Sequence, residues 1–76
     1  MVKFDRHARR RMKWRKISEA DVMTTLENPE RTEDTIKGRK NAYRLIGDRF
    51  LKVTYKFEPN GILVISAVVK DCGRTK

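Results

Sequence analysis

The chain has one cysteine, Cys72, and one histidine, His7, among its 76 residues. One cysteine cannot form an internal disulfide, and one cysteine with one histidine cannot complete the four ligands of a structural zinc site. The sequence also lacks a glycine-rich phosphate loop, a pair of carboxylates at catalytic spacing and a dinucleotide-binding pattern. These absences exclude disulfide scaffolds, zinc modules and most metabolic enzymes, and we expect neither a cofactor nor a metal ion.

Long apolar runs are absent as well. The longest, residues 62–69, spans eight residues and includes Ser66, whereas a membrane span needs about 20. The first residues, Met-Val-Lys-Phe-Asp, lead into a basic run and lack the apolar core and cleavage site of a secretory signal. We therefore expect no contact with a membrane, a cytoplasmic location and, at this length, one domain over residues 1–76.

Acidic residues are few: 10 Asp and Glu stand against 19 Lys and Arg, which gives a formal net charge of +9. Residues 1–16 hold eight basic side chains and one acidic one, residues 17–36 hold one basic and six acidic, and residues 37–58 hold seven basic and two acidic. Two basic blocks separated by an acidic block predict faces of opposite sign, and a polyanion site wherever the basic blocks meet.

Two helices are predicted in the first 28 residues. On a helical wheel over residues 5–16, one arc is mostly apolar but includes a histidine and two arginines. The members of this inner arc are Phe4, His7, Ala8, Arg11, Met12, Trp14 and Arg15. A second helix over residues 18–28 has Ser18 as its N-cap and Asp21 as the acid of a capping box, and Asn28-Pro29 ends it.

After Pro29 the apolar period changes from 3.6 to 2, which is typical of strands. The expected strands cover residues 32–36, 40–46, 49–57 and 62–70. Residues 72–76 are expected to form a frayed tail, and Val2 to Phe4 a short extra strand. The predicted fold class is α+β, with two N-terminal helices packed on a three- or four-stranded antiparallel sheet.

His7 and Arg11 are the first candidate pair for chemistry, because a spacing of four residues places them on one helical ridge, with Trp14 one turn further on. In the structural interpretation, Arg11 or Arg15 pairs with an acid such as Asp21 while its stem covers apolar surface. In the functional interpretation, Arg11 binds phosphate and His7 transfers a proton at a cleft.

Four polar side chains on predicted strands form a second candidate group. They are Arg44, Lys52, Tyr55 and Lys70. Their faces depend on the register at the Gly47-Asp48 turn: pairing with Leu51 turns Arg44 toward the helices, and pairing with Phe50 turns it outward.

The outer arc of the first helix is a third candidate, and it is made of cations. These are Arg6, Arg9, Arg10 and Lys13. Cations on one arc repel each other unless an anion is present, which favours contact with phosphate.

The order of these residues resembles a known family. The pattern is Phe4-Asp5-Arg6-His7-Ala8-x-x-Arg11-Met12-x-x-Arg15-x-Ile17-Ser18-x-x-x-Val22, followed by Leu26-Glu27-Asn28-Pro29 and by strands. Over about residues 4–70 it resembles small prokaryotic domains of unknown function marked by a His-Ala-x-x-Arg-Met helix. The element order and Ile65-Ser66-Ala67 in the last strand are similar to BrnT-type toxins, in the RelE/barnase-like group of metal-independent ribonucleases.

This resemblance implies a RelE/barnase-like fold and an RNA-directed protein, a metal-independent endoribonuclease toxin that an antitoxin with an acidic segment neutralises. The residues expected to transfer protons and stabilise the phosphorane are His7, Arg11, Arg44 and Lys70. The expected nucleic-acid-binding residues are Arg6, Arg9, Arg10, Lys13, Trp14, Arg15, Tyr43 and Lys52, with Trp14 or Tyr43 stacking a base. The alternative is a non-catalytic nucleic-acid or protein-binding module in which His7 and Arg11 are structural.

Overall fold

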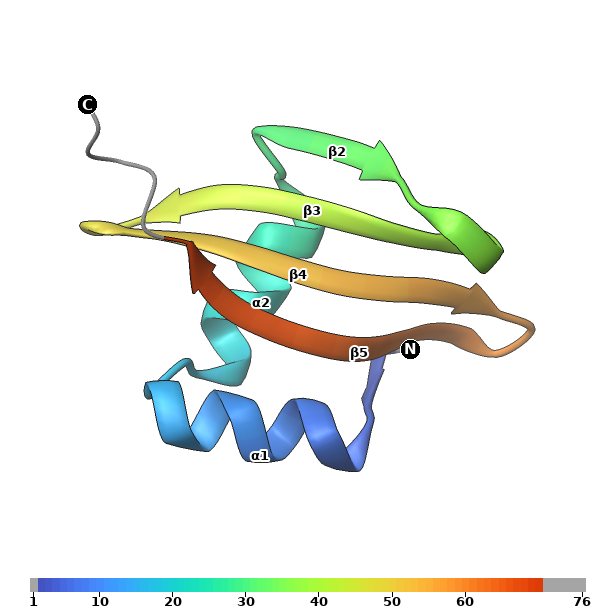
Figure 1. Cartoon of the computed structure of the whole chain (residues 1–76), viewed down its shortest axis with the longest axis horizontal. Helices are drawn as coiled ribbons and strands as arrows, with labels where there is room; N and C mark the ends of the chain where they lie inside the picture. Colours follow the sequence, from blue (N-terminus) through green and yellow to red (C-terminus); the bar gives the residue numbers. More distant parts are fainter. Residues whose placement is uncertain (1, 71–76) are drawn as a thin grey trace.

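The computed structural model of the chain describes residues 2–70. The expected tail, residues 72–76, lies outside the described residues. Along the chain the elements are β1 (Val2–Phe4), α1 (Arg6–Arg15), α2 (Glu19–Glu27), β2 (Arg31–Asp34), a 3-10 turn (Ile36–Gly38), β3 (Arg39–Ile46), β4 (Arg49–Glu58) and β5 (Gly61–Lys70). The predicted α+β class is confirmed, and Figure 1 shows α1 running beside β5 while α2 lies behind β3 and β4.

The sheet has five strands in the order β1-β5-β4-β3-β2. Strands β2 to β5 form an antiparallel meander, but β1 pairs with β5 in parallel, with Val2 opposite Ile62 and Phe4 opposite Val64. The four antiparallel strands and the short extra strand are present as expected, but the expectation of an antiparallel sheet is corrected: the sheet is mixed, because β1 pairs in parallel. Three residues are too few to show a period, and their direction is set by the helices that follow them.

The Gly47-Asp48 turn fixes the register between β3 and β4. Gly47 has a φ of 63°, a left-handed conformation that glycine adopts at no steric cost. Arg44 is paired with Leu51, so Arg44 lies on the face of the sheet that carries the helices. Of the two registers open in the sequence, the structure has the one that turns Arg44 inward.

The core lies between that face and the two helices. A register shift in β5 leaves Ile65 without a partner in β4, and this places both Val64 and Ala67 on the helix side of the sheet. The buried cluster consists of Ala8, Met12, Ile17, Val22, Leu51, Val53, Val64 and Ala67. Each strand and helix that contributes to it is thus held by a few small or branched side chains.

Helix α1 buries a much narrower stripe than its wheel predicts. Only Ala8 and Met12 are buried, whereas His7, Arg11 and Arg15 are exposed and Trp14 is 81% exposed. The assignment of these four side chains to the inner arc of the helix is therefore wrong. The physical reason is that α1 packs along a single strand, β5, beside the short edge strand, so one row of positions spaced by four residues makes the contact.

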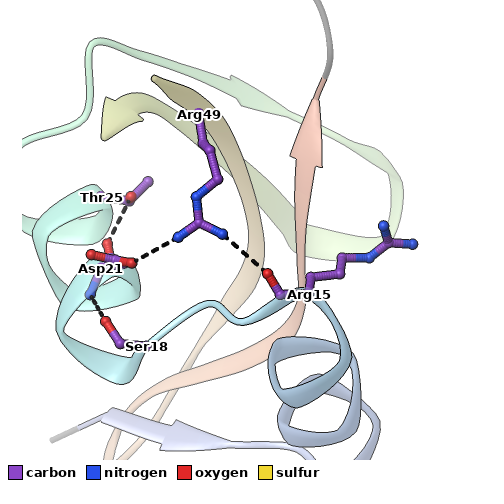
Figure 2. A network of polar contacts seen from close by, with 5 residues as sticks. All are labelled: Arg15, Ser18, Asp21, Thr25 and Arg49. Atoms are coloured by element: carbon purple, nitrogen blue, oxygen red, sulfur yellow. Dashed lines mark hydrogen bonds and ion pairs between the residues drawn. The ribbon is translucent and has the colours of Figure 1, made fainter. Parts of the chain in front are cut away.

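Helix α2 begins as predicted, with the Ser18 hydroxyl accepting a hydrogen bond from the backbone N–H of Asp21 at 3.0 Å. The Asp21 carboxylate does not close a capping box. It accepts a hydrogen bond from Nη2 of Arg49 at 3.3 Å, and Nη1 of Arg49 donates to the backbone carbonyl of Arg15 at 3.0 Å (Figure 2). Asp21 is therefore paired with Arg49 of β4 rather than with Arg11 or Arg15, and Arg49 ties both helices to the sheet.

Candidate functional site

The solvent side of α1 is the strongest concentration of charge in the fold. We call this set of exposed side chains the α1 face: Arg6, His7, Arg9, Arg10, Arg11, Lys13, Trp14 and Arg15. The helix contains no acidic residue, and even its first turn, where an acid would be stabilised by the helix dipole, has none. The composition of α1 is therefore poorly suited to stabilising an isolated helix.

Most cations of the α1 face have no counter-ion within the described part of the chain. Arg9 is the exception: Nη1 lies 2.8 Å from Oε2 of Glu19, and its guanidinium lies 5.2 Å from the centre of the Phe4 ring. Within residues 2–70, the other cations of the α1 face make no ion pair; these are Arg6, Arg10, Arg11, Lys13 and Arg15. No carboxylate between residues 2 and 70 pairs with these cations to relieve their mutual repulsion.

Trp14 stands between two crevices on this surface. The first has a volume of about 280 Å³ and is lined by His7, Arg10, Arg11, Trp14 and Arg15. The second has a volume of about 470 Å³ and is lined by Arg6, Arg9, Arg10, Lys13 and Trp14. Both crevices thus combine an aromatic ring with several guanidinium groups, the pair of groups that contacts bases and phosphates in nucleic-acid complexes.

The structure brings together two of the four expected catalytic residues. His7 and Arg11 line the same crevice. Arg44 does not reach it, because Arg44 lies on β3 and its Nη1 donates a hydrogen bond to the backbone carbonyl of Asn28 at 2.8 Å, at the end of α2. Lys70 lies on the opposite side of the sheet, since its neighbour Val69 faces the helices beside Leu51.

The side of the sheet without helices, the open sheet face, carries two more of the expected binding residues. Tyr43 and Lys52 are paired across β3 and β4 there. Tyr43 is 8% exposed, its ring stacks on Phe50 with 5.8 Å between centroids, and the Arg31 guanidinium lies 5.3 Å from its centre. The ring of Tyr43 is therefore already covered, unlike that of Trp14.

A polar network on the open sheet face was missed by sequence reasoning. Tyr43 donates a hydrogen bond from its hydroxyl to Oε1 of Glu33 at 2.6 Å, Asn41 Nδ2 donates to the same oxygen at 3.1 Å, and Thr54 donates to Oδ1 of Asn41 at 2.8 Å. The hydrogen bonds from Tyr43 and Asn41 hold the pKa of the Glu33 carboxyl below its usual value, and the same contact with Glu33, together with burial, raises the pKa of Tyr43.

The sequence feature that could have indicated this network is the period of two along each strand, which places alternate side chains on the same face of the sheet. Glu33 is paired with Asn41, and Asn41 with Thr54, so the three form one row across β2, β3 and β4. Such a row becomes visible only once the register of every strand is known. Tyr55, by contrast, is a buried residue on the helix side, in edge-to-face contact with Phe57.

Residues 2–70 contain no group of three or more His, Cys, Asp or Glu side chains placed to hold a metal ion. Neither helix within that range is long and apolar enough to span a membrane.

The family model described as domain of unknown function (DUF4258) matches residues 4–69. The chain belongs to this family. The DUF4258 match runs from the last residue of β1 to the penultimate residue of β5, so it covers both helices, the α1 face and all of the meander except Lys70. Comparisons with curated proteins and with solved structures gave no match.

Proposed function

We propose that this domain binds RNA through the α1 face. The observation that carries the proposal is the set of five unpaired cations on one ten-residue helix. Phosphate groups bound there would relieve the repulsion between these cations and release counterions from the RNA, which is the main source of affinity in such contacts. Anionic RNA also matches the formal net charge of +9.

Nucleic acid suits the α1 face better than a lipid surface. A helix that lies in a membrane interface needs a broad apolar side, but the apolar residues Ala8 and Met12 of α1 are buried in the core. Trp14 is the one large apolar side chain that α1 exposes. A cationic surface with a single exposed aromatic ring is typical of RNA contacts made to phosphates and unpaired bases.

A pair of charge-reversal variants tests the location of binding. Arg10→Glu combined with Arg11→Glu should lower affinity for a fluorescein-labelled 20-nucleotide RNA by at least about tenfold in fluorescence anisotropy, since two phosphate contacts become repulsive. Lys52→Glu combined with Lys70→Glu changes the net charge by the same amount, but on the open sheet face. This variant should lose much less RNA affinity than the α1 variant. Equal losses in the two variants, with unchanged thermal unfolding, would contradict a site on the α1 face.

RNA cleavage is a second candidate function, and the crevice shared by His7 and Arg11 favours it. His7 would take the proton of a 2′-hydroxyl, the 2′ oxygen would attack the adjacent phosphorus, and the 5′ oxygen would leave with a proton from water. Arg11 would stabilise the charge on the phosphorane. In the presence of EDTA, His7→Gln should reduce cleavage about 10²- to 10⁴-fold while RNA affinity stays unchanged. If the wild-type protein does not cleave RNA, the cleavage proposal fails and RNA binding remains as the proposed function.

A toxin relation of the BrnT type would add a protein partner to this proposal. An antitoxin with an acidic segment would be attracted to the same unpaired cations. We expect such a segment to compete with RNA, so that RNA added to the complex should displace it at low salt. If RNA and the acidic segment bind at the same time, the partner protein binds outside the α1 face.

A further inference from the structure

We infer that the α1 face takes single-stranded RNA, with one base stacked on Trp14 and the flanking phosphates in the two crevices. This inference rests on the proposed function and adds the strandedness of the ligand. Its starting point is the position of Trp14, which is 81% exposed and lines both crevices.

The exposure of Trp14 is not required by the fold. The core cluster is complete without it, and the ring makes no aromatic or cation–π contact with any residue between 2 and 70. Two aromatic rings elsewhere differ in this respect: the buried ring of Tyr43 is covered by Phe50 and Arg31, and the exposed ring of Phe57 contacts Tyr55. Trp14 therefore offers an unoccupied indole face to a ligand.

The cations around Trp14 are placed on both sides of the ring. Arg10 lines both crevices, with Arg11 and Arg15 in the first and Arg6 and Lys13 in the second. A strand that stacks a base on the indole must pass its phosphates to either side of that base. Each crevice then receives one phosphate, and Arg10 can contact either of them.

Strandedness follows from the need for a free base face. In a duplex each base is stacked between its neighbours and presents only its edge in a groove, so Trp14 could touch the backbone but not stack. An unpaired base has an accessible face, and stacking tolerates every base because each has one. The cations of the α1 face can bind the phosphates of either a duplex or a single strand, whereas Trp14 can stack only on a base of a single strand.

The experiment uses Trp14 as its own probe, because the chain has one tryptophan. A 12-nucleotide uridine RNA and a 12-base-pair RNA duplex are titrated into the protein at low salt while indole emission and acrylamide quenching are recorded. The single strand should change the emission and shield the indole from acrylamide, and the duplex should bind with both unchanged. Phosphatidylserine vesicles form a third arm.

Substitution of the ring gives the quantitative readout. Trp14→Ala should weaken single-strand binding about 5- to 150-fold, the range for loss of one stacked base, and leave duplex affinity within about twofold. Trp14→Phe should restore part of the loss. Phe57→Ala, which removes another exposed aromatic ring on β4, should leave binding of both RNAs unchanged.

The outcomes separate the two proposals. If both RNAs bind with unchanged indole emission, or if Trp14→Ala weakens both equally, the stacking inference is overturned while RNA binding by the α1 face stands. If neither RNA binds at low salt, both proposals fail. A blue-shifted indole emission with vesicles and no response to RNA would assign the face to a lipid surface and overturn both as well.

Discussion

The α1 face and the sheet both carry many basic side chains, but the two regions treat them differently. Of the nine arginines and lysines on the strands, four pair with a carboxylate within residues 2–70: Arg31, Lys40, Arg49 and Lys56. On α1, five of six arginines and lysines have no such partner among the described residues. The comparison teaches that the net charge of a small domain does not locate a binding surface. The positions of the charged side chains that lack an ion-pair partner are more informative.

The paired and unpaired cations have opposite consequences for stability. Partly buried pairs such as Arg49 with Asp21 hold elements together, whereas like charges one turn apart on a helix destabilise it by a few tenths of a kcal/mol each. Helix α1 keeps its shape because Ala8 and Met12 are buried against the sheet. The exposed cations of α1 therefore contribute nothing to this packing.

The largest effect we expect is on the salt dependence of RNA binding. If the five unpaired cations of the α1 face neutralise about five phosphates, the slope of log affinity against log salt should lie near −3 to −5. Affinity should then fall about 10²- to 10³-fold between 50 and 200 mM NaCl, measured by anisotropy. A slope near zero would show that these cations do not contact phosphates.

Neutralising one cation sharpens the comparison between the two regions. Arg10→Gln should make the slope less steep by about one, because one phosphate contact is lost. Lys52→Gln on the open sheet face should leave the slope as it is. If Lys52→Gln produced the larger change, the open sheet face would be the binding surface.

Removing a paired arginine should affect folding and spare binding. Arg49→Met breaks the hydrogen bonds to Asp21 and to the Arg15 carbonyl and leaves a partly buried carboxylate alone, which costs about 1–2 kcal/mol of unfolding free energy. Urea denaturation measures this loss. Arg39→Met, at an exposed position without an ion pair among the described residues, is the matched control and should stay within about 0.5 kcal/mol.

The smallest expected effect is a pH dependence from the open sheet face. The lowered pKa of Glu33 means that its contact with Tyr43 stabilises the fold fully above the usual value of 4.5, and that this stabilisation is lost as pH falls through the lower folded pKa. Thermal unfolding followed between pH 7 and pH 3 should show a shallower acid decline in Glu33→Gln. If the unfolding temperature falls equally with pH in the wild type and in Glu33→Gln, protonation of Glu33 does not contribute to acid unfolding.

Local signals in the sequence predicted the elements well. Ser18 marked the start of α2, and the Gly47-Asp48 turn limited Arg44 to two registers. The ends of the helices and of the long strands lie within two residues of the expected ranges. The sequence pattern is sufficient where one side chain and its immediate neighbours determine where an element begins or ends.

Contacts between distant segments were beyond the pattern. The helical wheel could not tell how wide a stripe α1 buries, because the width depends on β5 and β1 beneath it, and so Trp14 was assigned to the inner arc. Arg49 was not singled out, since its partners Asp21 and the Arg15 carbonyl lie far earlier in the chain. For the site, the cations were identified from sequence, but the crevices around Trp14 required the packed structure.

Helix α1 is anchored at both of its ends. The backbone N–H of Asp5, just before the helix, donates to the carbonyl of Val64 at 2.9 Å, and the carbonyl of Arg15, its last residue, accepts from Arg49. If α1 binds RNA as proposed, a helix fixed in this way has little conformational freedom left to lose on binding. We therefore expect association to be a rapid rigid-body encounter, with loss of α1 cations lowering mainly the association rate.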